Sequence, residues 1–468
     1  MENRIVRIES ITIENFKNVT RGTLVFENKR KQYKASVLGL YGQNGSGKTA
    51  LIDALQLLKF ALCGKPIPQK YADYINVDAD CATLKYEFVV RYAEVVYNAW
   101  YQFSMRKVID ENTVSVDETT NTSTTTKVEL FDEVLSFSYE SKTDKMRKAP
   151  FVDTRTDDLF APKAKMQELV GDDKEKYMDL LVTKRLTKAT SRSFIFSREL
   201  INQCRQNCKN ELYMNLIESL YTYGHRELFI IDTESIGLIS LNTLPLMFKY
   251  KHGVSETFGS LPLPLNGSTL IPEDLYGVVE NVIENMNIVL EQLVPGLRIK
   301  VVDLGSALTK EGKIAKKIEL MSLKNNKQIP FCYESEGIKK IVSILQLLIV
   351  VYNHPSVTVA VDELDGGVFE YLLGELLNII SEKGKGQLIF TSHNLRPLET
   401  IDKGFIAFTT TNPKMRYIRM TNVKETNNLR DFYYRDIVLG EQNEQVYNPT
   451  NKYEIALAFR EAGEVYGS

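Results

Sequence analysis

The sequence predicts an α/β fold organised around one glycine-rich loop, and three observations lead to this prediction. An apolar run ends at Gly42 and is followed by the loop GQNGSGKT and a helical pattern. Two more apolar runs, Val357–Val361 and Gln387–Thr391, end in polar residues, as strands of a buried parallel sheet do. Residues 83–139 contain aromatic and β-branched runs typical of strands, so this stretch is expected to be rich in β-structure.

The composition is that of an ordinary globular protein. The 468 residues are 43% hydrophobic and 25% charged, and the net charge of −2 provides no general attraction to nucleic acid or membranes. Cys204 and Cys208 have one-turn helical spacing, but the sequence supplies no second Cys or His pair near them, so no zinc site is expected. Without a secretory segment or an apolar run of about 18 residues, we expect a soluble, cytoplasmic protein with no membrane partner.

The glycine-rich loop matches the phosphate-binding pattern G-x-x-x-x-G-K-[ST] in full. Its glycines allow a tight turn whose N–H groups point at phosphate oxygens, and the following helix adds its positive N-terminal end. Lys48 is expected to reach the β- and γ-phosphates, and Thr49 to place a hydroxyl on Mg²⁺. The loop therefore predicts ATP or another nucleoside triphosphate with Mg²⁺, bound by Gly42, Gln43, Asn44, Gly45, Ser46, Gly47, Lys48 and Thr49.

The order of the patterns predicts two halves of one core around an insertion. Strand-like residues 1–40 precede the loop, and the helix after it is expected to stop near Gly64. Helical patterns follow at Glu199–Tyr223 and from Pro272 onward. The predicted organisation is a first half of the core, a mainly helical insertion, a second half of the core and a tail, over residues 1–140, 141–296, 297–435 and 436–468.

Local composition leaves two questions about nucleic acid open. The aromatic residues within 83–139 are interpreted as sheet core in preference to a base-stacking platform. Basic residues gather after residue 140 and are interpreted first as a solvated face, with DNA or RNA contact as the alternative: Lys142, Lys145, Arg147, Lys148, Lys184, Arg185, Lys188 and Arg192. A polar loop, rich in Thr, Ser and Asn, is expected at residues 119–126.

Polar residues after the later apolar runs predict the rest of the site. Asp362 and Glu363 end a buried strand, where carboxylates are costly without a task. We expect Asp362 to hold Mg²⁺ through water and Glu363 to orient or activate the attacking water. Asp365 follows directly, and His393 ends the next buried strand as a candidate γ-phosphate sensor. Ser335 and Gly337 begin an apolar helix and offer a hydroxyl and N–H groups to an anion.

This succession of motifs resembles the ABC-class ATPases. The phosphate-binding loop, an ESEG signature at 334–337, DE at 362–363, an Asp just after it and TSHN at 391–394 occur in the family's order. The opening ITIENFKN, the DELD motif and NNLRD in the tail are similar to OLD-like ATP-binding proteins of bacteria, in the group that includes SMC-type DNA-repair heads. Many of those proteins act in anti-phage systems. The resemblance covers residues 5–90 and 297–435 and implies an ABC-type P-loop core with an antiparallel β-subdomain.

The resemblance also implies residue roles. Ser335 and Gly337 would act in trans on the γ-phosphate held by a second protomer, Asp365 would belong to the D-loop, and His393 to the switch. The protein would therefore form an ATP-dependent homodimer or higher oligomer. The signature is ESEG in place of the transporter sequence LSGGQ, which argues against a transporter. Gln69, Asn76 and Gln102 are poor candidates for the family's Q-loop residue, so the second protein ligand of the metal is unassigned.

The function implied is an ATPase that switches conformation through dimerisation. By resemblance, it would be the sensor subunit of an anti-phage system of the PARIS, Septu or RloA type, controlling a separate nuclease or toxin and contacting DNA or a phage protein. The tail lacks the length and acidic pattern of the TOPRIM nuclease domain found in OLD nucleases. Two alternatives stay open: a DNA-repair or DNA-end-processing head that acts directly on nucleic acid, and an ATP-gated structural scaffold.

Overall fold

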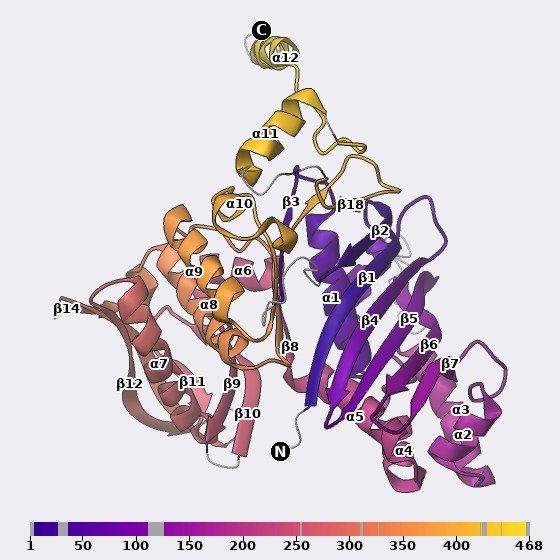
Figure 1. Cartoon of the computed structure of the whole chain (residues 1–468). Helices are drawn as coiled ribbons and strands as arrows, with labels where there is room; N and C mark the ends of the chain where they lie inside the picture. Colours follow the sequence, from indigo (N-terminus) through magenta and orange to yellow (C-terminus); the bar gives the residue numbers. More distant parts are fainter. Residues whose placement is uncertain are drawn as a thin grey trace, which may run out of the picture.

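Two six-stranded sheets form the body of the protein in a computed structural model, and two smaller lobes and C-terminal helices are attached to them (Figure 1). The structure describes residues 4–26, 36–110, 126–252, 255–308, 312–325, 327–421, 423, 428–440 and 442–464. The polar loop expected at 119–126 lies outside these residues up to position 125. The predicted α/β class, with a mixed sheet and an antiparallel β-subdomain, is confirmed.

The first sheet is antiparallel and carries most of the N-terminal third. Its order is β2-β1-β4-β5-β6-β7, with bounds β1 (Arg4–Phe16), β2 (Val19–Val25), β4 (Ala82–Tyr92), β5 (Val95–Ile109), β6 (Thr126–Glu140) and β7 (Lys145–Asp153). Buried and partly exposed residues alternate along β4 and β5, as expected for strands with one face on the core. The expectation that residues 83–139 are rich in strands is confirmed.

The second, central sheet contains the phosphate-binding loop. Its order is β18-β17-β3-β16-β15-β8, with bounds β3 (Ser36–Tyr41), β8 (Leu228–Ile231), β15 (Thr358–Val361), β16 (Gln387–Thr391), β17 (Ile406–Thr409) and β18 (Tyr417–Ile418). All pairs are parallel except β17 with β18. Every residue of β3, β8, β15 and β16 is buried, because helices and the antiparallel sheet cover both faces.

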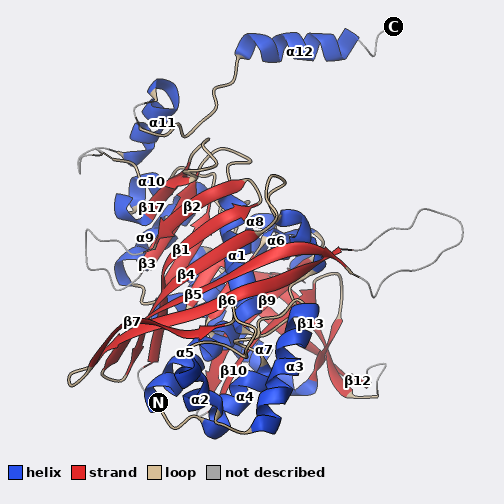
Figure 2. Ribbon diagram, turned by 90° about the vertical axis from the view of Figure 1, so that its right-hand side faces the viewer, coloured by secondary structure: helices blue, strands red, loops and turns tan. Residues whose placement is uncertain are grey.

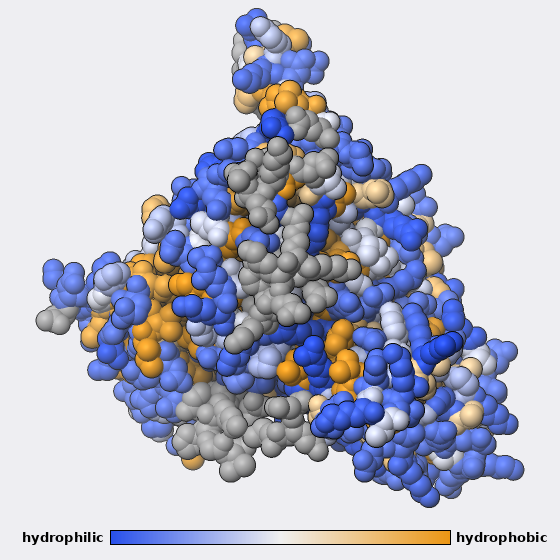
Figure 3. Space-filling view, in the orientation of Figure 1, coloured by the Kyte–Doolittle hydropathy of each residue, from blue (hydrophilic) through white to orange (hydrophobic). Residues whose placement is uncertain are grey.

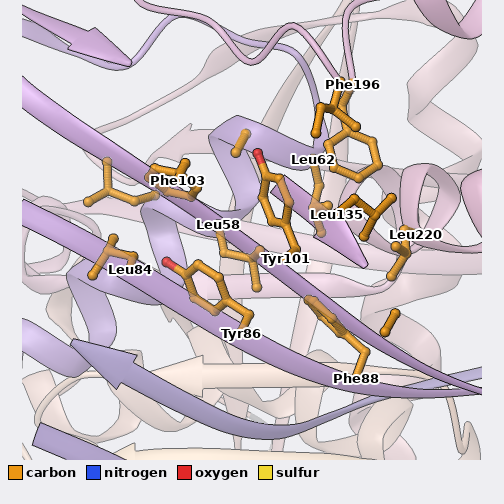
Figure 4. Close-up of a cluster of buried hydrophobic side chains, with 14 of the residues drawn as sticks. Leu58, Leu62, Leu84, Tyr86, Phe88, Tyr101, Phe103, Leu135, Phe196 and Leu220 are labelled. Carbon is orange, nitrogen blue, oxygen red and sulfur yellow. The ribbon is translucent and has the colours of Figure 1, made fainter. Parts of the chain in front are cut away.

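A shared apolar core joins the first sheet to the helix that follows the loop. Helix α1 (Lys48–Leu62) ends close to Gly64, as predicted. Figure 4 shows Leu58 and Leu62 of this helix packed among aromatic side chains of β4 and β5. The hydroxyl of Tyr86 donates to the carbonyl oxygen of Ala54 at 2.6 Å, so this aromatic residue belongs to the core. The interpretation of these aromatics as sheet core is confirmed.

Residues 141–296 differ from the expected mainly helical insertion. Helices do occupy the first part: α2 (Lys163–Val170), α3 (Lys174–Ala189), α4 (Arg198–Asn207) and α5 (Glu211–Arg226). The pattern over 199–223 is thus two helices, because Asn210 caps a new one. The chain then adds β8 to the edge of the central sheet, so the stretch contributes a strand to the core as well as a peripheral lobe.

A second lobe follows β8. It comprises α6 (Thr233–Ser240), β9 (Thr243–His252), β10 (Ser255–Pro264), β11 (Thr269–Pro272), α7 (Glu273–Leu293), β12 (Leu297–Leu308), β13 (Ile314–Lys324) and β14 (Lys327–Pro330). The helix expected from Pro272 is α7, and its apolar residues Val279, Val282 and Met286 are buried. Figure 3 shows apolar surface on this side of the molecule, where exposed side chains include Ile288, Leu304, Leu308, Ile314 and Ile329.

The first C-terminal helices pack beside the central sheet, and the last one lies away from it (Figure 2). Helix α8 (Glu336–Asn353) and α9 (Glu370–Lys383) pack beside the sheet, followed by α10 (Pro397–Thr400), α11 (Leu429–Leu439) and α12 (Lys452–Glu464). Figure 2 shows α12 standing away from the body. Among the described helices, none combines the length and apolar character needed to cross a membrane.

Polar side chains join the two large sheets. The side chain of Gln387 accepts from the backbone N–H of Ile8 at 2.9 Å and donates to its carbonyl oxygen at 2.8 Å. The same amide oxygen accepts from the Thr358 hydroxyl at 2.9 Å. One buried glutamine therefore ties β1 to β16 and β15, and fixes the antiparallel sheet relative to the central one.

We predict that Gln387→Leu lowers the free energy of unfolding by about 1–3 kcal/mol, because it leaves the Ile8 amide buried and unpaired. Chemical denaturation of the full chain measures this change. Gln328→Leu, at an exposed position on β14, is the control and should change stability by less than about 0.5 kcal/mol. Equal stability of Gln387→Leu and wild type would contradict the role of Gln387 in joining the two sheets.

Candidate functional site

The phosphate-binding loop follows the end of β3 and begins α1. Gly42, Gly45 and Gly47 all have positive φ angles, of 154°, 74° and 95°. A Cβ on Gly42 would lie 1.7 Å from the Thr409 hydroxyl oxygen, so the close approach of β17 requires glycine there. The glycines of the motif are therefore explained by backbone geometry in the structure itself.

Lys48 is held inside the loop. Its ammonium donates to the carbonyl oxygens of Gly42 at 2.8 Å and Gln43 at 3.0 Å. Burial lowers the pKa of Lys48, while the nearby carboxylates, Asp362 above all, act in the opposite direction. A cation in this position can move a short distance from the loop carbonyls to incoming phosphate oxygens.

A cavity of about 750 Å³ opens beside the loop and brings both halves of the chain together. From the N-terminal part it is lined by Lys17, Asn18, Asn44, Gly45, Gly47, Lys48, Thr49 and Ala50, and from the C-terminal part by Asp362, Glu363, Asp365, Gly366 and His393. Most residues assigned to the site from sequence therefore surround one space. Gly42, Gln43 and Ser46 belong to the same loop without lining the cavity.

The acidic pair is positioned by two threonines. The Asp362 carboxylate accepts from the Thr391 hydroxyl on one oxygen and from the Thr233 hydroxyl, at 2.9 Å, on the other. Thr391 Oγ1 also accepts the backbone N–H of Glu363 at 2.8 Å. These bonds hold the carboxylate of Asp362, a residue that is only 1% exposed. Glu363, in contrast, is exposed and has a left-handed φ of 43°. Glu363 thus places an exposed carboxylate at the border of the cavity, from a strained backbone position.

Asp365 organises the turn that carries His393. Its carboxylate accepts the backbone N–H of His393 at 3.2 Å and that of Asn394 at 3.0 Å. The His393 side chain is exposed and borders the cavity. In this structure Asp365 thus acts on its own chain, by fixing the loop after β16.

Two residues at the turn between β1 and β2 border the cavity but were not predicted from the sequence. Asn18 donates its side-chain amide to the carbonyl oxygen of Gly45, and Lys17 forms an ion pair with Asp53 on α1. Burial raises the pKa of Asp53, and Lys17 opposes this shift. Both side chains border the cavity, but a single Lys and Asn after a strand carry no recognisable pattern. Only the pairing of the two segments in space reveals them.

Ser335 and Gly337 lie at the start of α8, outside the cavity lining. The Ser335 hydroxyl accepts the backbone N–H of Ile338 at 3.3 Å and caps the helix. A Cβ on Gly337 would lie 2.1 Å from the carbonyl oxygen of Gly367, so the helix start presses against the loop after Asp365. The chain brings this signature next to the acidic loop but does not direct it into its own cavity.

The possible Q-loop residues are also outside the lining. Gln69, Asn76 and Gln102 do not border the cavity, and the Asn76 side chain donates to the carbonyl oxygen of Lys17 at 3.0 Å. Among the described residues, no group of three or more His, Cys, Asp or Glu side chains is arranged to hold a metal ion. The donors present, the Thr49 hydroxyl and the Asp362 carboxylate, are oxygen ligands and fit Mg²⁺, which keeps several waters.

Comparison with known protein families finds a match over part of the chain. Residues 10–212, less than half of the chain, match a family model described as an AAA domain. No curated protein matches.

Solved structures are similar over most of the chain at low identity. An SMC head bound to the C-terminal winged-helix domain of ScpA has 12% identity and a TM-score of 0.39, covering 89% of this chain and 98% of that one. The SMC head domain from Thermotoga maritima has 12% identity and a TM-score of 0.34, covering 89% and 99%. The recombination mediator RecF has 12% identity and a TM-score of 0.34, covering 88% and 98%.

We predict that Thr391→Val lowers the rate of ATP turnover about 10- to 100-fold, because the hydroxyl that orients Asp362 and Glu363 is lost. Phosphate release measures the rate, and titration with a fluorescent ATP analogue should show nucleotide affinity within about 3-fold of wild type. Thr391→Ser keeps the hydroxyl and is the control. A Val variant as fast as wild type would contradict this role.

Proposed function

We propose that this chain binds ATP with Mg²⁺ and hydrolyses it to ADP and phosphate. The observation that carries the proposal is the single cavity bordered by Lys48 and Thr49 on one side and by Asp362, Glu363 and His393 on the other. These residue types supply what phosphoryl transfer to water requires: positive charge, a metal site and a carboxylate for the water.

The reaction follows from what each group can do. The loop N–H groups and Lys48 bind the β- and γ-phosphates and offset their charge. Thr49 and Asp362 would hold Mg²⁺, which would neutralise phosphate charge. Glu363 is exposed to the cavity and orients or activates the attacking water, and His393 senses the γ-phosphate from the neighbouring turn. Asp365 keeps that turn in place.

We further propose that the active form is an ATP-dependent homodimer. Ser335 and Gly337 do not border the cavity of their own chain, so they would reach the γ-phosphate of a second copy. Large apolar side chains are exposed around this signature: Tyr333, Phe369 and Tyr371. Such a patch beside a polar site is typical of a surface that becomes covered on association.

The biological role is proposed on the resemblance to OLD-like proteins alone. ATP binding and slow hydrolysis would switch the dimer between two conformations, and the chain would be the sensor subunit of an anti-phage system that controls a separate nuclease or toxin. The alternative of direct action on DNA has less support from the basic cluster after residue 140. There Lys142 pairs with Glu94 at 2.5 Å, and the Lys148 ammonium lies 3.9 Å from the centre of the Trp100 ring.

Glu363→Gln is expected to reduce ATP turnover at least about 100-fold while ATP is still bound, because the amide cannot act as a base. Phosphate release and fluorescent-nucleotide titration give the two quantities. Glu370→Gln, an exposed glutamate at the start of α9, is the matched control and should turn over at the wild-type rate. Full activity of Glu363→Gln would remove the catalytic role from this carboxylate.

Ser335→Arg tests the proposed dimer. In the background of Glu363→Gln, ATP is expected to convert the protein from monomer to dimer, and the added Arg side chain to prevent this by steric clash at the interface. Light scattering after size exclusion, with and without ATP and Mg²⁺, measures the mass. A dimer that persists with Ser335→Arg would argue against the signature as part of the interface.

A further inference from the structure

Helix α8 carries two consecutive buried lysines with different surroundings. Lys339 is 6% exposed, and its ammonium donates to the side-chain oxygen of Asn242 at 2.8 Å. Lys340 is 2% exposed, and no described residue accepts a hydrogen bond from its ammonium. A buried cation without a partner is costly and is expected where it has a task. The unpaired ammonium therefore distinguishes Lys340 from its neighbour.

Lys340 lies on the helix whose start contacts the loop after the acidic segment of the site. It is three residues after Gly337, whose backbone presses on Gly367 at the end of that segment. The charges that favour its protonated form are those of Asp362, Asp365 and Glu363, in that order. Burial outweighs them and lowers the pKa of Lys340 to about 8. These three carboxylates therefore lie close enough to act on the charge of Lys340.

The same three carboxylates also act on Lys48. The acidic segment therefore lies within the fields of two buried lysines, one from the phosphate-binding loop and one from the signature helix. Lys48 borders the cavity. Lys340 does not, so it is not placed to bind phosphate there. Lys340 can therefore act on the site through the positions of Asp362, Glu363 and Asp365.

We propose that Lys340 is a positioning residue of the hydrolytic site, whose buried ammonium holds the segment Asp362–Asp365 in place against helix α8. This inference rests on the proposed ATPase function. It links the start of α8, where the signature lies, to the carboxylate that handles the attacking water. A displacement of α8 when a second copy binds would then change the position of Glu363 directly.

Lys340→Met tests the proposal, because it keeps most of the side-chain volume and removes the charge. We expect kcat to fall at least about 10-fold, with the KM for ATP and the affinity for a fluorescent ATP analogue within about 2-fold of wild type. The melting temperature should stay equal or rise, because an unpaired buried charge has been replaced by an apolar group. Lys340→Arg should recover part of kcat, and Lys339→Met, the matched control, should keep it within about 2-fold.

The outcomes separate this inference from the function on which it rests. If wild type hydrolyses ATP and Glu363→Gln does not, but Lys340→Met retains the wild-type kcat, the role of Lys340 is overturned and the ATPase stands. A Lys340→Met variant with a lower melting temperature and unchanged kcat shows a structural lysine and also overturns it. Equal loss of kcat in Lys339→Met overturns the specific role. Wild type without hydrolysis overturns both proposals.

Discussion

The parallel pairing of β3, β16 and β15 is the constraint on which the site depends. Residue Leu40 is in register with Thr391, and Val361 with Phe390, so the three strands end at one edge of the sheet. The residues that follow them are the phosphate-binding loop, the turn with His393 and the acidic pair. Because carboxyl ends of parallel strands meet, groups far apart in the chain converge without any long loop.

Burying carboxylates at that edge requires compensation, and the structure supplies it locally. Two threonine hydroxyls satisfy Asp362, and backbone N–H groups satisfy Asp365. Two buried lysines, Lys48 and Lys340, provide opposite charge near these carboxylates. A site that is held by hydrogen bonds and by charges that are not directly paired can respond when an anion arrives.

The antiparallel sheet contributes residues to the site because it is fixed to the central sheet. Gln387 fixes β1 against the central sheet, and the turn that ends β1 then places Lys17 and Asn18 at the cavity. Lys17 pairs with Asp53 on α1. A movement of one sheet relative to the other would therefore reach the loop through this turn and through helix α1.

The sequence by itself determined the fold class and the positions of the glycine-rich loop, the acidic pair and His393 at the ends of strands, because these depend on local backbone needs and on residues beside one another in the chain. It also determined helices α1 and α7 and the strands of residues 83–139 from periodicity. Only the tertiary structure decided that β8 belongs to the central sheet, that Thr233 and Thr391 donate to Asp362, and that Lys17 pairs with Asp53 at the border of the cavity. Their partners are distant in sequence, and a lone Thr or Lys has no pattern, so burial and hydrogen bonding in the folded chain give them their roles.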